Sequence, residues 1–162
     1  MALSAGTRRL AFLGVLIALS VVGANIKLGP WSIALDSTPG FLAALIFGPA
    51  AGALVSAAGH LAVAVATGFP LTPVFHLFVA VTMAGVGAVG GLTAARFGRP
   101  VAAAAIVIAN GVVAPALLSL LPNPMGRALF MAMVLPLTLA AAVNALLALM
   151  LATALQRSRL IS

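Results

Sequence analysis

Three side chains in the sequence could take part in acid–base chemistry or bind a metal: Asp36, His60 and His76. Asp36 is the only acidic residue, and the chain has no cysteine. One carboxylate and two imidazoles offer little for general acid–base catalysis or a metal centre. The patterns H-E-x-x-H, G-x-S-x-G and G-x-x-x-x-G-K-[ST] do not occur. The sequence therefore predicts no enzyme, no cofactor or metal site, and no ATP-binding subunit.

The same residues could instead hold a small molecule, because polar groups at membrane depth usually face a cavity or the bundle interior. The candidates for substrate contact are Asn25, Trp31, Asp36, His60, Phe75, His76, Asn110 and Asn144. Each also has a structural explanation. Amide and imidazole side chains hydrogen-bond between membrane helices, Trp31 and Phe75 suit a membrane interface, and Asp36 could pair with Lys27.

The composition indicates what must position these residues. Of the 162 residues, 64% are hydrophobic and 6% are charged, and the mean hydropathy is +1.31. The net charge is +7, but the basic residues stand in pairs between apolar runs, as the loop charges of membrane proteins do. We expect an all-α membrane protein, with residues 1–162 forming a single membrane domain and no nucleic-acid partner.

Proline and glycine divide the apolar sequence into six predicted spans. The segments are about 8–26, 39–48, 49–67, 73–95, 100–121 and 125–156. The second is short, and the alternative is one helix over 39–67, which leaves five spans. The first span also resembles a cleaved secretory signal, because Arg8 and Arg9 precede it; the apolar segments that follow favour a retained span. Pro115 and Pro136 are expected to kink the last two helices.

Basic residues decide the predicted topology, because positive charge stays cytoplasmic. Six spans with both termini cytoplasmic leave only Lys27 and Arg127 outside, a split of 6 to 2. The best five-span arrangement gives 5 to 3. With six spans the polar candidates gather in the outer half or at the midplane, which predicts a pocket that opens outward.

The sequence resembles a known transporter family. Three stretches carry this resemblance: Leu35-Asp-Ser-Thr-Pro-Gly with its continuation to Pro49, Gly59-His60, and Gly68-Phe-Pro-Leu-Thr72 into Pro73-Val-Phe-His76. They resemble the S components of energy-coupling-factor (ECF) vitamin transporters. The similarity is best over about residues 8–95, and the last two spans agree only in topology. Within the family, these motifs look most like members assigned to α-ribazole, a cobalamin precursor.

The resemblance implies a subunit that binds a vitamin-like molecule from outside and works with an ECF membrane subunit and two ATPase subunits. It implies docking through small residues of the first span, here Gly14 and Ala18, with Gly at the first position where Ala is usual. It also implies that the loop from Lys27 to Thr38 acts as a lid. The alternatives are an S component for riboflavin or pantothenate, a stand-alone secondary transporter and, with least support, a lipid-acting membrane enzyme.

Overall fold

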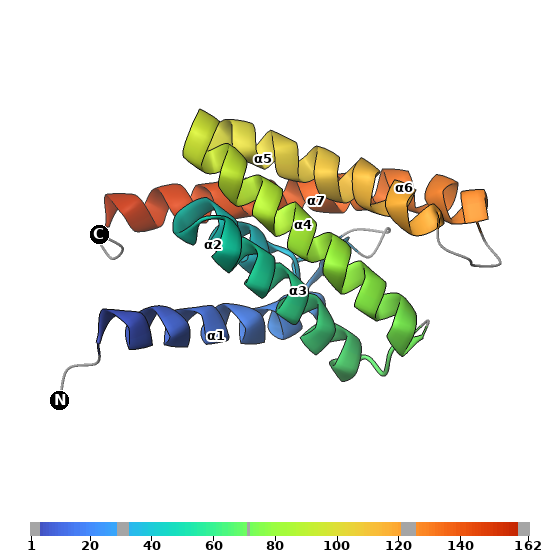
Figure 1. Ribbon diagram of the computed structural model, residues 1–162, viewed down its shortest axis with the longest axis horizontal. Coiled ribbons are helices and arrows are strands. Elements are labelled where there is room, and N and C mark those ends of the chain that lie inside the picture. The colour runs from blue at the N-terminus through green and yellow to red at the C-terminus, as the bar shows by residue number, and fades with distance from the viewer. Residues whose placement is uncertain (1–3, 29–32, 71, 121–125, 159–162) are drawn as a thin grey trace.

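The computed structural model describes residues 4–28, 33–70, 72–120 and 126–158 of the chain. The helices are α1 (Ala5–Ala24), α2 (Thr38–Phe47), α3 (Pro49–Ala66), α4 (Pro73–Phe97), α5 (Arg99–Ile108), the π-helical turn η1 (Ala109–Val113), α6 (Ala114–Ser119) and α7 (Gly126–Arg157). Two short strands, β1 (Lys27–Leu28) and β2 (Ile33–Ala34), pair antiparallel between α1 and α2. The predicted all-α bundle of six helical segments is confirmed, since α5, η1 and α6 run as one rod (Figure 1).

Five of these segments are long and apolar enough to cross a bilayer, whereas α2 is not. Ten residues of helix reach about 15 Å, half of a hydrocarbon core of about 30 Å. The alternative of one helix over 39–67 is wrong, because Gly48 adopts a φ of 86° and separates α2 from α3. Eight consecutive residues of α2, from Thr38 to Leu45, are buried, so this short helix lies at the centre of the bundle.

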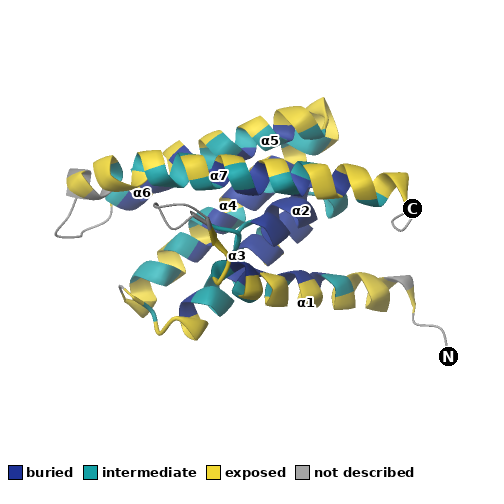
Figure 2. Ribbon diagram, turned by 180° about the vertical axis from the view of Figure 1, so that it is seen from behind, coloured by how far each residue is buried: buried dark blue, intermediate teal, exposed yellow. Residues whose placement is uncertain are grey.

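The long helices have exposed outer faces (Figure 2), and many large apolar side chains lie on the exposed surface. Leu10, Val81 and Leu146 are each more than half exposed. A soluble monomer rarely exposes apolar surface on this scale, and such a surface suits lipid. Together with the five candidate spans, it identifies a multi-pass membrane protein.

Glycines bring α3 and α4 into direct backbone contact. A Cβ atom added to Gly52 would lie 2.6 Å from the carbonyl oxygen of Gly87, and a Cβ on Gly87 would meet the Gly52 carbonyl. Small residues permit this close approach of membrane helices. The pair holds α3 and α4 side by side, and these two helices carry His60 and His76.

Two arginines hydrogen-bond to backbone carbonyls at the C-terminal end of α2. Arg99 Nε donates to the Leu45 carbonyl at 2.9 Å, and Arg9 Nη2 donates to the Phe47 carbonyl at 3.2 Å. The last carbonyls of a helix lack intrahelical partners, and positive charge is favourable there. The start of α1 and the end of α7 lie at this same end of the bundle (Figure 1). The basic residues of three segments therefore collect at one end of the molecule.

Candidate functional site

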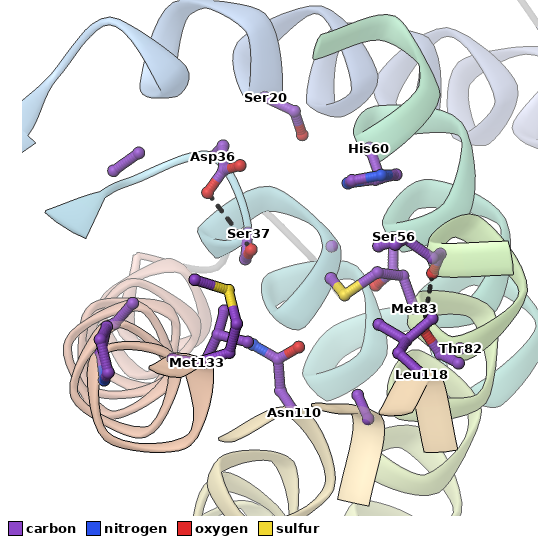
Figure 3. Close-up of a pocket in the computed structure, with 17 residues that line it drawn as sticks. Ser20, Asp36, Ser37, Ser56, His60, Thr82, Met83, Asn110, Leu118 and Met133 are labelled. Atoms are coloured by element: carbon purple, nitrogen blue, oxygen red, sulfur yellow. Dashed lines mark hydrogen bonds between the residues drawn. The ribbon is translucent and has the colours of Figure 1, made fainter. Parts of the chain in front are cut away.

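A cavity of about 300 Å³ lies at the opposite end of α2 from these arginines. Residues of α1, α2, α3, α4, α7 and the α5–η1–α6 rod line it, together with the segment that joins β2 to α2. Figure 3 shows polar side chains pointing into it from several elements. Those in the lining are Ser20, Asp36, Ser37, Ser56, His60, Thr82 and Asn110. The remaining wall is apolar and includes Met83, Leu118 and Met133.

Asp36 reaches the cavity from the segment between β2 and α2. Ser37 Oγ donates a hydrogen bond to its Oδ1 at 3.3 Å (Figure 3). Burial raises the pKa of Asp36 above its ordinary value of 3.8, and the hydrogen bond from Ser37 opposes this effect only in part. The alternative of a pair with Lys27 is not found; within the described ranges, no cation forms an ion pair with this carboxylate. The backbone N–H groups of Asp36 and Ser37 also donate to it, and the residue lines the cavity, where a bound molecule can reach it.

His60 and His76 meet between α3 and α4. His60 Nε2 lies 3.1 Å from His76 Nδ1, within hydrogen-bond distance. Only His60 lines the cavity, whereas His76 lies behind it with the edges of Phe69 and Phe75 packed against its ring. His76 Nε2 is buried without a hydrogen-bond partner among the described residues. The two histidines thus act as one unit, with one ring facing the cavity.

Asn110 enters the cavity from the π-helical turn. The backbone N–H of Ala114 donates to the Ala109 carbonyl, five residues back, and Pro115 follows at the next position. This wide turn precedes the proline that lacks an N–H, and such turns often occur at functional sites. Asn110 is 6% exposed and lines the cavity, and its amide has no hydrogen-bond partner in the part of the chain described.

Asn144 does not line the cavity, because all of its hydrogen-bonding groups are engaged elsewhere. Its Oδ1 accepts from the backbone N–H of Thr38 at 2.8 Å and from the Thr38 hydroxyl at 2.7 Å. Its Nδ2 donates to the carbonyls of Ala34 and Ala140 at 2.8 and 2.9 Å. Asn144 therefore ties the chain on both sides of Asp36 to α7, which positions the carboxylate without contacting the cavity itself.

The other predicted residues that the structure describes lie apart from the cavity. Asn25 is exposed, and its amide donates to the Val21 carbonyl at 2.9 Å. Phe75 packs against His76, with ring centroids 6.4 Å apart. Trp31 lies outside the described residues. Gly14 and Ala18 lie on an exposed face of α1, where a Cβ on Gly14 would meet no atom within 4 Å.

Sequence reasoning missed four hydroxyl side chains of the lining: Ser20, Ser37, Ser56 and Thr82. Ser20 and Ser56 each pack against a glycine of a neighbouring helix. A Cβ atom added to Gly59 would lie 2.5 Å from Ser20 Oγ, and one added to Gly40 would meet Ser56 Oγ. The signal was present in the sequence. A serine inside an apolar span is a polar group at membrane depth, as much as the asparagines that were selected.

Comparison with protein families agrees with this arrangement. The model of the ECF transporter substrate-specific component matches residues 8–155. The chain belongs to this family. It is therefore an S component, the substrate-binding subunit of an ECF importer, and it works with the ECF membrane and ATPase subunits. Comparison with curated proteins and with solved structures gives no match.

Family membership gives the cavity its role. An S component binds a small molecule and is not an enzyme, which fits a site with one carboxylate, one histidine pair and one free amide. A volume of about 300 Å³ is at the lower end of the range for small-molecule pockets, about 300–1,000 Å³. The cavity is the candidate substrate site of this S component.

Proposed function

We propose that this S component captures α-ribazole, a benzimidazole ring joined to a ribose, for cobalamin salvage. The motifs around Asp36, His60 and His76 resemble S components assigned to this molecule. The single observation that carries the proposal is that the cavity lining combines hydrogen-bonding side chains with apolar ones. A nucleoside-like molecule needs both kinds of contact, because it has ribose hydroxyl groups and a flat apolar ring.

The polar lining residues are suited to ribose. Asp36 offers acceptor oxygens, and the Asn110 amide offers a donor and an acceptor; both line the cavity, and Asp36 forms no ion pair in the described chain. Ser56 Oγ is buried without a partner among the residues described. Buried polar groups are normally hydrogen-bonded. Substrate hydroxyls would satisfy these groups, which supports a sugar in the cavity.

The apolar lining residues are suited to the ring. Met83 and Met133 both line the cavity, with their sulfur atoms drawn toward it in Figure 3. Thioether sulfur makes favourable contacts with aromatic rings, and flexible methionine fits an irregular ring outline. Phe75 does not provide a stacking face, since it packs behind His76. We therefore assign ring contact to the two methionines.

We also infer that the cavity opens to the outside and that both termini are cytoplasmic. The first turn of α2 borders the cavity at Gly40, whereas its last carbonyls bind Arg9 and Arg99. Positive charge marks the cytoplasmic side. This supports an orientation with the cavity toward the outer side, where a substrate arrives. Gly14 and Ala18, exposed on α1, are then the proposed docking face for the ECF membrane subunit.

Titration calorimetry of the purified S component without ATP tests the proposal, with α-ribazole, riboflavin and pantothenate as separate ligands. We expect only α-ribazole to bind. Asn110→Leu removes a cavity amide at similar volume and is expected to weaken binding about tenfold, the effect of losing one good hydrogen bond. Asn25→Leu is the matched control, because Asn25 is exposed and remote from the lining, and its affinity should be unchanged.

Two results would contradict the proposal. Binding of riboflavin or pantothenate with no response to α-ribazole would leave the S-component role intact and reject the substrate. Uptake of α-ribazole into liposomes by this chain alone would instead support the stand-alone transporter considered above, because an S component needs its partner subunits.

A further inference from the structure

The histidine pair shares one hydrogen bond, and its geometry restricts where the protons lie. His60 Nε2 and His76 Nδ1 are 3.1 Å apart, so one nitrogen donates and the other accepts. A neutral imidazole has one N–H and one lone pair. If His60 Nε2–H donates, the proton of His76 lies on its Nε2. If His76 Nδ1–H donates, His60 carries its proton on Nδ1 and His76 Nε2 is a bare lone pair.

The surroundings of His76 Nε2 favour the second arrangement. This atom is buried and has no hydrogen-bond partner among the residues that the structure describes. A buried N–H without an acceptor is rarer in proteins than an unused acceptor. The proton of His76 therefore lies on Nδ1.

The consequence for His60 follows directly. Its Nε2 must accept from His76, so its own proton lies on Nδ1. His60 Nδ1 has no protein partner in the described part of the chain, and the ring lines the cavity (Figure 3). The group that this histidine offers to a bound molecule is then an N–H donor, whereas Asp36 offers acceptors from the segment between β2 and α2.

We propose that His76 is a positioning residue that fixes the tautomer of His60, so that the site selects molecules with an acceptor atom at His60 and donor groups at Asp36. This inference rests on the proposed function, because it names the polarity of the substrate in the same cavity. A benzimidazole riboside has this polarity, since its unsubstituted ring nitrogen carries a lone pair and its ribose hydroxyls donate. An otherwise identical indole riboside has a C–H in place of that nitrogen.

Spectroscopy tests the proton positions without any ligand. The chain has only two histidines, so ¹⁵N–¹H correlation spectra of ¹⁵N-histidine-labelled protein in micelles should show two ring systems, and His76→Phe assigns them. We expect both rings to carry their proton on Nδ1. A spectrum in which His60 is protonated on Nε2 would overturn the inference, whichever vitamin the protein binds.

Ligand selectivity tests the consequence for binding. We expect α-ribazole to bind about tenfold more tightly than its indole analogue, because the analogue leaves the His60 N–H unpaired. His60→Gln keeps an N–H donor and should retain most of this preference, whereas His60→Met has a similar length without a donor and should bind both ligands equally. His76→Phe should reduce the preference and leave His60 with a mixture of tautomers.

The outcomes separate this inference from the proposed substrate. The donor role of His60 would be refuted if the wild-type protein bound both ligands equally, or if His60→Met kept the preference for α-ribazole. Either result would leave α-ribazole as the proposed substrate. Binding of neither ligand would refute α-ribazole, and the spectra would still decide the tautomer. If His60→Met does not fold, His60→Gln and the wild-type ligand pair provide the same comparison.

Discussion

Replacing Asn144 with leucine should destabilise the protein far more than its distance from the cavity suggests. The two side chains have similar volume, so the substitution removes hydrogen bonds without opening a large void. Three groups lose their partner: the backbone N–H of Thr38, the hydroxyl of Thr38 and the carbonyl of Ala34. The Ala140 carbonyl is not counted, because it lies one turn back in the same helix.

The magnitude follows from the two backbone groups, because the Thr38 hydroxyl can rotate toward another acceptor. A buried backbone group left unpaired costs about 1–3 kcal/mol, so the two groups give a loss of about 2–6 kcal/mol for Asn144→Leu. Thr38→Val removes only the hydroxyl and should cost about 1 kcal/mol. The double variant should lose less than the sum of the two, since both substitutions break the same bond.

The assay is a denaturant titration of the protein in micelles, followed by circular dichroism. The matched control is Asn25→Leu, because Asn25 also donates to a carbonyl four residues back but is exposed; its effect should stay within about 0.5 kcal/mol. If Asn144→Leu has the same free energy of unfolding as this control variant, the reasoning is wrong. The variant should also bind substrate more weakly, because Asp36 loses both of its anchors.

Three further predictions concern packing, charge and topology. Gly87→Ala places a methyl group against the backbone of α3 and should cost about 1–3 kcal/mol, whereas Gly85→Ala meets no atom within 4 Å and should be neutral or stabilising in the same titration. The raised pKa of Asp36 means that the folded state holds this proton more tightly, so stability should fall as pH rises from 3.8 to the folded pKa and then level off. Asp36→Asn should remove that decline; a decline that persists would contradict it. Because the chain has no cysteine, single cysteines at Ser158 and Thr72 can be labelled in cells with an impermeant maleimide, and reaction at Thr72 alone is expected; reaction at Ser158 would reverse the topology.

Much of the fold could be predicted because membrane helices have a strong local signal. Prolines at 39, 49, 73 and 100 stand at helix starts in the structure, where the missing N–H has no partner to lose. The break at Gly48 was predicted from the Gly48-Pro49 pair and from the way basic residues divide between the two sides of the membrane in the six-span and five-span arrangements. The β1–β2 hairpin was not predicted, since two residues per strand are too few to show an alternating pattern.

The candidate site could be predicted only in part, because residue type indicates polarity but not direction. His60 and Asn110 were predicted as polar groups at membrane depth and Asp36 as the acid of the outer loop, and all three line the cavity. Asn144 was selected by the same rule, yet it faces the β2–α2 segment. Separating the two asparagines requires knowing which face of each helix packs inward. The π-helical turn that carries Asn110 also has no clear sequence signal apart from the proline after it.

The short helix α2 connects the candidate cavity to the two arginines at its other end. Its first turn borders the substrate cavity, and its last carbonyls are held by Arg9 and Arg99. A helix packed on all sides moves as a rigid body, so a displacement at one end is carried about 15 Å to the other. A force on those two guanidinium groups would therefore also displace the part of α2 that lines the candidate substrate cavity.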